Sequence, residues 1–233
     1  MLRRNENGAE AIPRASLVED AYAALKTAIR ENAYPPGHQI SEQEIAAQLN
    51  MSRTPVHEAL IRLQAEGLVR ILPRRGVVVS SVSPDDIREI YDVTIALESM
   101  AAELLAKKPD EERRAVANDL ILTTKDMEAR LAADDLAGWA KADDRFHRLL
   151  VERCGNGRLT RLLETVQDQS HRARVMTLRL RPKPIGSASQ HMEIVEAIRR
   201  GDPPAARDAA YRHRAGARDQ IVPLLNEYGM RHL

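Results

Sequence analysis

The sequence predicts a mainly α-helical protein of two parts, in which three helices and a β-hairpin precede an antiparallel bundle of six helices. Three observations predict this class. The 233 residues suffice for two modest domains. Five arginines face two acidic residues between Met51 and Gly76, whereas nine acidic residues face three basic ones between Pro84 and Glu112. After Ser83, apolar residues recur at helical spacing and no segment has the pattern of a strand.

Composition restricts the class of protein further. With 43% hydrophobic and 30% charged residues, the chain is typical of a globular protein, and no apolar run is long enough for a transmembrane helix. The single cysteine, Cys154, excludes an internal disulfide framework. Residues 1–15 lack the apolar run of a secretory signal. We therefore expect a cytoplasmic protein with a flexible leader over residues 1–15 and no membrane partner.

Two helices are predicted at the start of the first part. Apolar residues recur at helical spacing over residues 17–32, and the turn formers of residues 34–37 end that helix. Ser41 followed by Glu44 is a capping box, which begins a short second helix. Asn50 closes this second helix.

A third helix and a hairpin complete the first part. Ser52 or Thr54 caps the third helix, Pro55 lies in its first turn, and Gly67 ends it. Two runs rich in β-branched residues, 68–72 and 77–82, flank a Pro-Arg-Arg-Gly turn. This pattern predicts a two-stranded hairpin with a basic tip.

The second part, residues 83–229, is predicted to be helical throughout. Ser83 and Pro84 form a helix cap followed by a first-turn proline. Turn formers then separate six helices at residues 108–110, 133–135, 155–157, 182–186 and 201–204. No repeat of fixed period occurs, so a solenoid is not expected.

The second and third helices of the first part have the arrangement of a helix-turn-helix, which presents the start of its second helix to the major groove of DNA. Arg53 can pair with guanine there, and Thr54 can contact a phosphate or a thymine methyl group. Arg75 beside Gly76 at the hairpin tip suits entry into a minor groove. The alternative is a solvated basic surface, but the cap, the turn and both basic features occur together, which favours DNA binding.

Four residues of the helical part are typical of a metal site. Asp143 and His147 are four residues apart, so their side chains leave the same face of one helix. His191 and His213 lie on the last two predicted helices. Four such ligands can converge in a bundle core and bind zinc, or alternatively nickel, manganese or iron. On spacing alone, an Asp-His surface hydrogen bond and ordinary helix histidines are the competing interpretation.

Residues 16–82 resemble the GntR family of bacterial transcription regulators. The resemblance is carried by the motif Ser-Glu-Gln-Glu-Ile-Ala from Ser41 and by Ser-Arg-Thr-Pro-Val-His-Glu-Ala-Leu from Ser52. It implies a winged helix-turn-helix that binds double-stranded, palindromic operator DNA as a homodimer. The positions implied to contact DNA are Ser52, Arg53, Thr54, Pro55, Arg75 and Gly76. His57 stands where the family usually has arginine, which indicates a shifted operator preference or a phosphate contact.

Residues 84–228 resemble the FCD effector domain of the FadR-type branch of these regulators. The motifs are Asp-Asp-Arg-Phe-His, Gly-Asn, His-Met-Glu-Ile and Tyr-Arg-His, which begin at Asp143, Gly155, His191 and Tyr211. With six predicted helices rather than seven, the domain is similar to that of the VanR subgroup. Metal-binding members of the domain use one aspartate and three histidines, which the resemblance places on Asp143, His147, His191 and His213.

The expected function is that of a ligand-responsive transcription repressor, not an enzyme, that binds a divalent metal and a small carboxylic acid. An arginine-rich stretch without acids, residues 171–181, supplies a counter-charge for the acid, and Arg172 and Arg174 are the candidates. Thr94 stands where many relatives carry arginine, which weakens any anion-binding role at that position. The alternatives are a metal-dependent hydrolase and a regulator with purely structural histidines and a non-acid effector.

Overall fold

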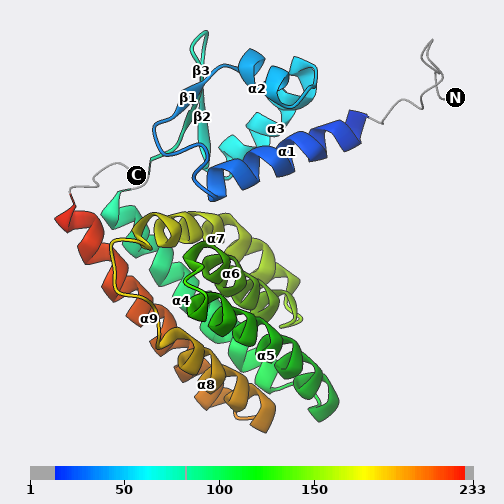
Figure 1. The fold of residues 1–233 in the computed structure, drawn as a ribbon. Helices are drawn as coiled ribbons and strands as arrows, with labels where there is room; N and C mark the ends of the chain where they lie inside the picture. Colours follow the sequence, from blue (N-terminus) through cyan, green and yellow to red (C-terminus); the bar gives the residue numbers. More distant parts are fainter. Residues whose placement is uncertain (1–13, 82, 229–233) are drawn as a thin grey trace, which may run out of the picture. The chain divides into compact units, whose positions relative to one another are not determined.

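The structure is a computed structural model that describes residues 14–81 and 83–228. The chain divides after Ser81 into two compact units, which we call the N-terminal and the C-terminal unit. The predicted mainly helical class is confirmed, with a small sheet confined to the N-terminal unit (Figure 1). The expected leader falls mostly outside the described residues, and a helix already begins at Arg14.

The described residues of the N-terminal unit form three helices and a three-stranded antiparallel sheet. Their order is α1 (Arg14–Arg30), β1 (Gln39–Ile40), α2 (Glu42–Gln48), α3 (Arg53–Ala65), β2 (Val69–Leu72) and β3 (Gly76–Val79). The predicted hairpin is β2 and β3, with Ile71 opposite Val77. The sequence analysis missed β1, which pairs with the other edge of β3, because two residues are too short to show an alternating pattern.

Local signals set the ends of α2 and α3. The predicted capping box is present: the Ser41 hydroxyl accepts from the Glu44 amide, and the Glu44 carboxylate accepts from the Ser41 amide. Asn50 takes a positive φ of 52° in the turn between α2 and α3, as asparagine tolerates. The helices then enclose a core with the sheet, to which Leu25 and Leu63 contribute.

The C-terminal unit is helical over all of its described residues except the connections. Its helices are α4 (Pro84–Ala106), α5 (Asp110–Ala132), α6 (Leu136–Glu152), α7 (Gly157–Thr177), α8 (Ser187–Arg200) and α9 (Pro203–Glu227). All five predicted breaks fall between these helices. None of the described helices is both long and apolar enough to cross a membrane.

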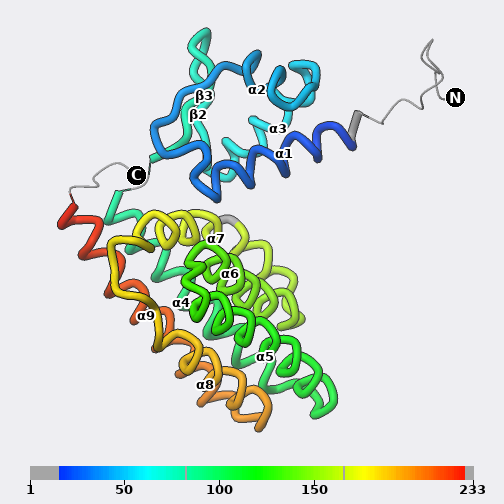
Figure 2. Tube along the Cα trace, viewed as in Figure 1, coloured from blue at the N-terminus to red at the C-terminus, as the bar shows by residue number. Residues whose placement is uncertain are grey.

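Helix α4 is central to the packing of this unit. It lies along α9, contacts α7, and also meets α6 and α8 (Figure 2). Ser83 and Asp86 form a capping box at its start, with Pro84 in the first turn as predicted. Cys154 and Phe146 are buried in the main core of this unit. This arrangement brings residues of α4, α6, α8 and α9 together in the interior.

Candidate metal centre and nucleic-acid interface

The four predicted metal ligands meet inside the C-terminal unit. Asp143 and His147 come from α6, His191 from α8 and His213 from α9, and one ligand atom of each lies within 4.8 Å of the others. All four side chains are buried. Burial contradicts the competing interpretation of a hydrogen bond at the surface.

The histidine rings turn the same nitrogen toward one point. His213 Nε2 lies 3.1 Å from His191 Nε2 and 3.3 Å from His147 Nε2. One oxygen of Asp143, Oδ1, lies 3.7 Å from Nε2 of both His147 and His191. Three ring nitrogens and a carboxylate oxygen form a ligand set that suits zinc and neighbouring divalent metals.

Hydrogen bonds at the far side of two rings determine where their protons lie. His147 Nδ1 donates to Glu98 Oε2 at 2.9 Å, and His213 Nδ1 donates to Gln190 Oε1 at 2.9 Å. Neutral rings bonded in this way turn the lone pairs of their Nε2 atoms toward each other. Two facing lone pairs repel, and a cation between them removes the repulsion, so the residues present fit a metal ion.

The pKa values of the cluster also favour a cation. Burial, with the neighbouring rings, holds the pKa values of His191 and His213 well below their usual range. Burial alone would raise the pKa of Asp143, but His147 and Arg174 together hold it well below its usual range. The site therefore combines a carboxylate with neutral imidazoles at His191 and His213, the protonation states that ligate metals.

The sequence analysis missed a buried ion pair behind His147. Glu98 on α4 accepts hydrogen bonds from Arg214 Nε at 2.7 Å and Nη2 at 2.5 Å, besides the one from His147. Both side chains of the pair are 1% exposed. Burial would raise the pKa of Glu98, but Arg214 and His147 hold it far below its usual range. No sequence signal marks the pair, because 116 residues separate its members.

A cavity of about 450 Å³ opens beside the four candidate ligands. Asp143, His213 and Trp139 form part of its wall. Arg174 and Arg181 also line the cavity. With Lys183 and Arg214, these make four cationic side chains on the cavity wall, which suits an anionic ligand.

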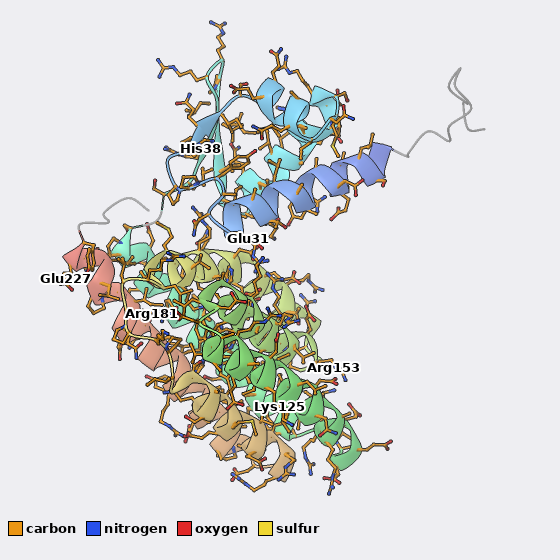
Figure 3. All side chains as sticks on the ribbon, viewed as in Figure 1. Glu31, His38, Lys125, Arg153, Arg181 and Glu227 are labelled. Carbon is orange, nitrogen blue, oxygen red and sulfur yellow. The ribbon has the colours of Figure 1, made fainter. Side chains whose placement is uncertain are left out.

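Arg174 and Arg181 differ in their surroundings. Arg174 Nε lies 3.4 Å from Asp143 Oδ2, so this guanidinium is already engaged by a carboxylate. Arg181, labelled in Figure 3, has Nε and Nη2 buried without a hydrogen-bond partner, 5.9 Å from guanidinium carbon to the Trp139 ring centroid. Burial lowers the pKa of Arg181.

Of the two arginines predicted to bind the effector, Arg172 is not among those that line the cavity. Positions two apart on a helix point to nearly opposite sides, so Arg174 faces the cavity and Arg172 does not. Arg172 is instead buried elsewhere in the unit, where burial lowers its pKa to about 10. The sequence signal that could have found Arg181 is its place in the same arginine-rich stretch.

The predicted DNA contacts lie at the start of α3. Ser52 occupies the N-cap, but its hydroxyl makes no capping hydrogen bond, and Ser52, Arg53 and Thr54 are all exposed. Pro55 is different: its ring is buried, which removes it from the surface that can contact DNA. The N-terminus of α3 therefore presents free hydroxyl groups and one arginine to solvent.

A carboxylate from α2 contacts the same surface. Glu42 Oε1 lies 2.8 Å from His57 Nδ1, and Glu42 Oε2 lies 3.5 Å from Arg53 Nη2. His57 is half exposed, one helical turn after Arg53. The sequence analysis did not single out Glu42.

The tip of the hairpin carries the remaining predicted contacts. Arg75 is exposed, and its carbonyl accepts from Gln39 Nε2 at 2.7 Å. Gly76 has a φ of +87°, and a Cβ there would lie 2.5 Å from the Ile40 carbonyl oxygen. The glycine is therefore required by its backbone conformation and by the close approach of β1, whatever it does on DNA.

Comparison with known families gives one match in each of the two units. Residues 17–79 match the family described as bacterial regulatory proteins, gntR family, and residues 89–216 match the FCD domain. The first match covers the helix-turn-helix and the hairpin, and the second covers all four candidate ligands.

Individual relatives are transcription regulators. An uncharacterized HTH-type transcriptional regulator in the TAR-I ttuE-ttuC' intergenic region of Agrobacterium vitis is 51% identical over 63% of this chain and 85% of its own length. The HTH-type transcriptional repressor RspR of Escherichia coli is 27% identical over 86% of this chain and 87% of its own. The E. coli McbR/YncC structure shares the fold, with a TM-score of 0.78 and 19% identity over 91% of this chain and 98% of that one.

Proposed function

The chain belongs to the gntR family of bacterial regulatory proteins and carries an FCD domain, and we propose that it is a repressor controlled by a divalent metal ion and a small carboxylic acid. As a regulator of this type it binds DNA and is not an enzyme, so the hydrolase alternative is set aside. The relative that is named a repressor supports the direction of control.

We assign DNA contact to the start of α3 and to the hairpin tip. Arg53 is exposed at a helix N-terminus, where its guanidinium can bond guanine, and Ser52 and Thr54 have hydroxyls suited to phosphate. Arg75 is exposed on the turn, where it can enter a minor groove. Two copies of this surface in a homodimer would bind the two halves of a palindromic operator.

The observation that carries the metal assignment is the facing pair of imidazole nitrogens, 3.3 Å apart, on His147 and His213. Their Nδ1 atoms are engaged by Glu98 and Gln190, so both Nε2 atoms can serve as ligands of a metal ion placed between them. Zinc suits three imidazoles and one carboxylate, and nickel, manganese and iron are the competing ions.

The cavity beside the cluster supports an acid as the effector. A bound divalent ion would supply a Lewis-acid anchor for a carboxylate oxygen. Arg181 has two buried nitrogens without a hydrogen-bond partner on the cavity wall, and a carboxylate can accept from both. Arg174 adds positive charge but is already engaged by Asp143.

Helix α4 provides a route from this site to the link with the N-terminal unit. Glu98 on α4 holds His147, and α4 begins at Pro84, directly after that link. We propose that acid binding at the cluster repositions α4 through Glu98 and so changes the spacing of the two DNA-binding surfaces.

Metal analysis by plasma mass spectrometry tests the proposal. We expect about one divalent ion per chain in the wild type and in His38→Ala, a control in the N-terminal unit, and none in His147→Ala/His213→Ala. A screen of small carboxylic acids should then raise the melting temperature of the metal-loaded protein only. Acid binding that is unchanged in protein without metal would show that the histidines are structural and would contradict the metal-dependent effector site.

A further inference from the structure

Two exposed side chains at the start of α3 share one carboxylate. Arg53 and His57 are 68% and 49% exposed, and Glu42 contacts both while its own side chain is only 16% exposed. Glu42 therefore lies behind the two side chains that face solvent. Its short contact is the one to His57 Nδ1, at 2.8 Å.

This contact determines which tautomer His57 adopts. A carboxylate only accepts hydrogen bonds, so the hydrogen between the two atoms belongs to His57 Nδ1. In a neutral imidazole the other nitrogen, Nε2, then carries a lone pair and no hydrogen. His57 thus offers an acceptor to a partner in solution, whereas its neighbour Arg53 offers only donors.

The major-groove edges of the bases discriminate between a hydrogen-bond acceptor and a hydrogen-bond donor on the protein. Guanine presents only acceptors there, N7 and O6, and thymine presents the acceptor O4 and a methyl group. Adenine and cytosine each present an exocyclic amine, which is a donor. An acceptor at His57 therefore pairs with adenine or cytosine and is repelled by guanine O6 and thymine O4.

We propose that His57, in the tautomer held by Glu42, recognises a base with an exocyclic amine in each operator half-site, beside the guanine recognised by Arg53. Glu42 is a positioning residue in this scheme, since it acts through His57. The inference rests on the proposed use of α3 as the helix that enters the major groove. It specifies the base that this helix selects.

Selection of duplexes from a randomised library, with the full chain at pH 8, tests the inference. The wild type should enrich one base pair at one position of each half-site, with its adenine or cytosine on the strand that His57 contacts. His57→Arg should convert that position to guanine. Glu42→Gln should lose the preference, because an amide can donate or accept and no longer fixes the tautomer. The control Glu19→Gln removes a carboxylate of the same unit that bonds Arg62, and it should keep the wild-type preference.

Base analogues then test the hydrogen bond itself. Purine in place of adenine, or 2-pyrimidinone in place of cytosine, removes the amine from the selected position. We expect binding of the wild type to weaken about threefold to tenfold and binding of His57→Ala to be unaffected by the analogue. The two analogues also separate adenine from cytosine as the selected base.

Three outcomes would overturn the inference: no base-pair preference at that position in the wild type, an equal loss with the analogue in His57→Ala, or the same selected base pair in His57→Arg. A phosphate contact by His57 would produce the last result. In each case Arg53→Ala should still weaken binding to the selected duplex, which keeps the proposed function. Failure to enrich any duplex would contradict the proposed function itself.

Discussion

At the scale of single residues, buried charged side chains pair with one another inside the C-terminal unit. Glu98 serves two partners at once, since it accepts from Arg214 and from the ring nitrogen of His147. A buried carboxylate with a buried cation is stable only when both are present, because either alone would be an uncompensated charge in the interior. Glu98 therefore stabilises the fold and orients a candidate metal ligand, His147, through the same side chain.

We expect Glu98→Gln to destabilise the protein by about 3–5 kcal/mol, because it leaves Arg214 buried without its counter-charge. Metal affinity should also fall about tenfold to a hundredfold, since His147 loses the carboxylate that orients it. Urea unfolding followed by circular dichroism, together with metal titration, measures both effects. Glu103→Gln on the same helix is the control, and an equal loss of stability there would contradict the assignment.

Arg181→Met should weaken the response to acid without removing the metal. Methionine keeps an apolar stem near Trp139 but lacks the guanidinium, so the affinity for a carboxylate should fall about tenfold to a hundredfold. Calorimetric titration with the best acid of the thermal screen measures this loss. Arg179→Met removes an exposed arginine two positions away and should bind acid as the wild type does.

At the scale of elements, two serines at equivalent helix positions have different roles. Ser41 caps α2 with a complete capping box, whereas Ser52 caps α3 without a side-chain hydrogen bond. The sequence pattern predicts a cap at both positions, but only the structure shows which hydroxyl is committed. The free hydroxyl is the one at the proposed DNA surface.

We therefore expect substitution of one serine to affect stability and substitution of the other to affect DNA binding. Ser41→Ala should destabilise the N-terminal unit by about 1 kcal/mol, which faster amide hydrogen exchange in α2 would show. Ser52→Ala should leave exchange nearly unchanged and weaken DNA binding to all sequences alike, as expected for a phosphate contact. Faster exchange throughout α3 in Ser52→Ala, without a change in DNA affinity, would reverse the assignment.

At the scale of the whole molecule, function depends on two compact units joined after Ser81. The first carries the helix-turn-helix, and the second carries the four candidate metal ligands and the cavity beside them. A dimer can transmit a signal between such units only if the distance between its two DNA-binding surfaces matters for binding. The spacing of operator half-sites reports that distance.

Insertion of about five base pairs between the half-sites should weaken binding strongly, because it places them on opposite faces of the duplex. Insertion of about ten base pairs should restore part of the affinity, since it returns both half-sites to the same face. Gel-shift titrations with the full chain measure both affinities. Equal binding to all three duplexes would show that the two DNA-binding surfaces act independently.

Most of the element boundaries could be predicted because local chemistry determines them. The breaks at prolines and glycines, the capping boxes at Ser41 and Ser83, and the αL turn at Asn50 depend on a few neighbouring residues. The strand β1 was not predicted. Its two residues pair with β3, a segment distant in sequence, and Gly76 allows the close approach of the two strands.

By itself, the sequence determined the two-part helical fold, the helix-turn-helix and the four residues that converge as candidate ligands. The types and helical spacing of these four residues already restrict the kind of ion that they could bind. Only the tertiary structure decided which other side chains complete the sites: Glu98 with Arg214, Arg181 rather than Arg172 on the cavity wall, and Glu42 behind His57. The physical reason is that burial and pairing between distant segments depend on packing, which no local pattern records.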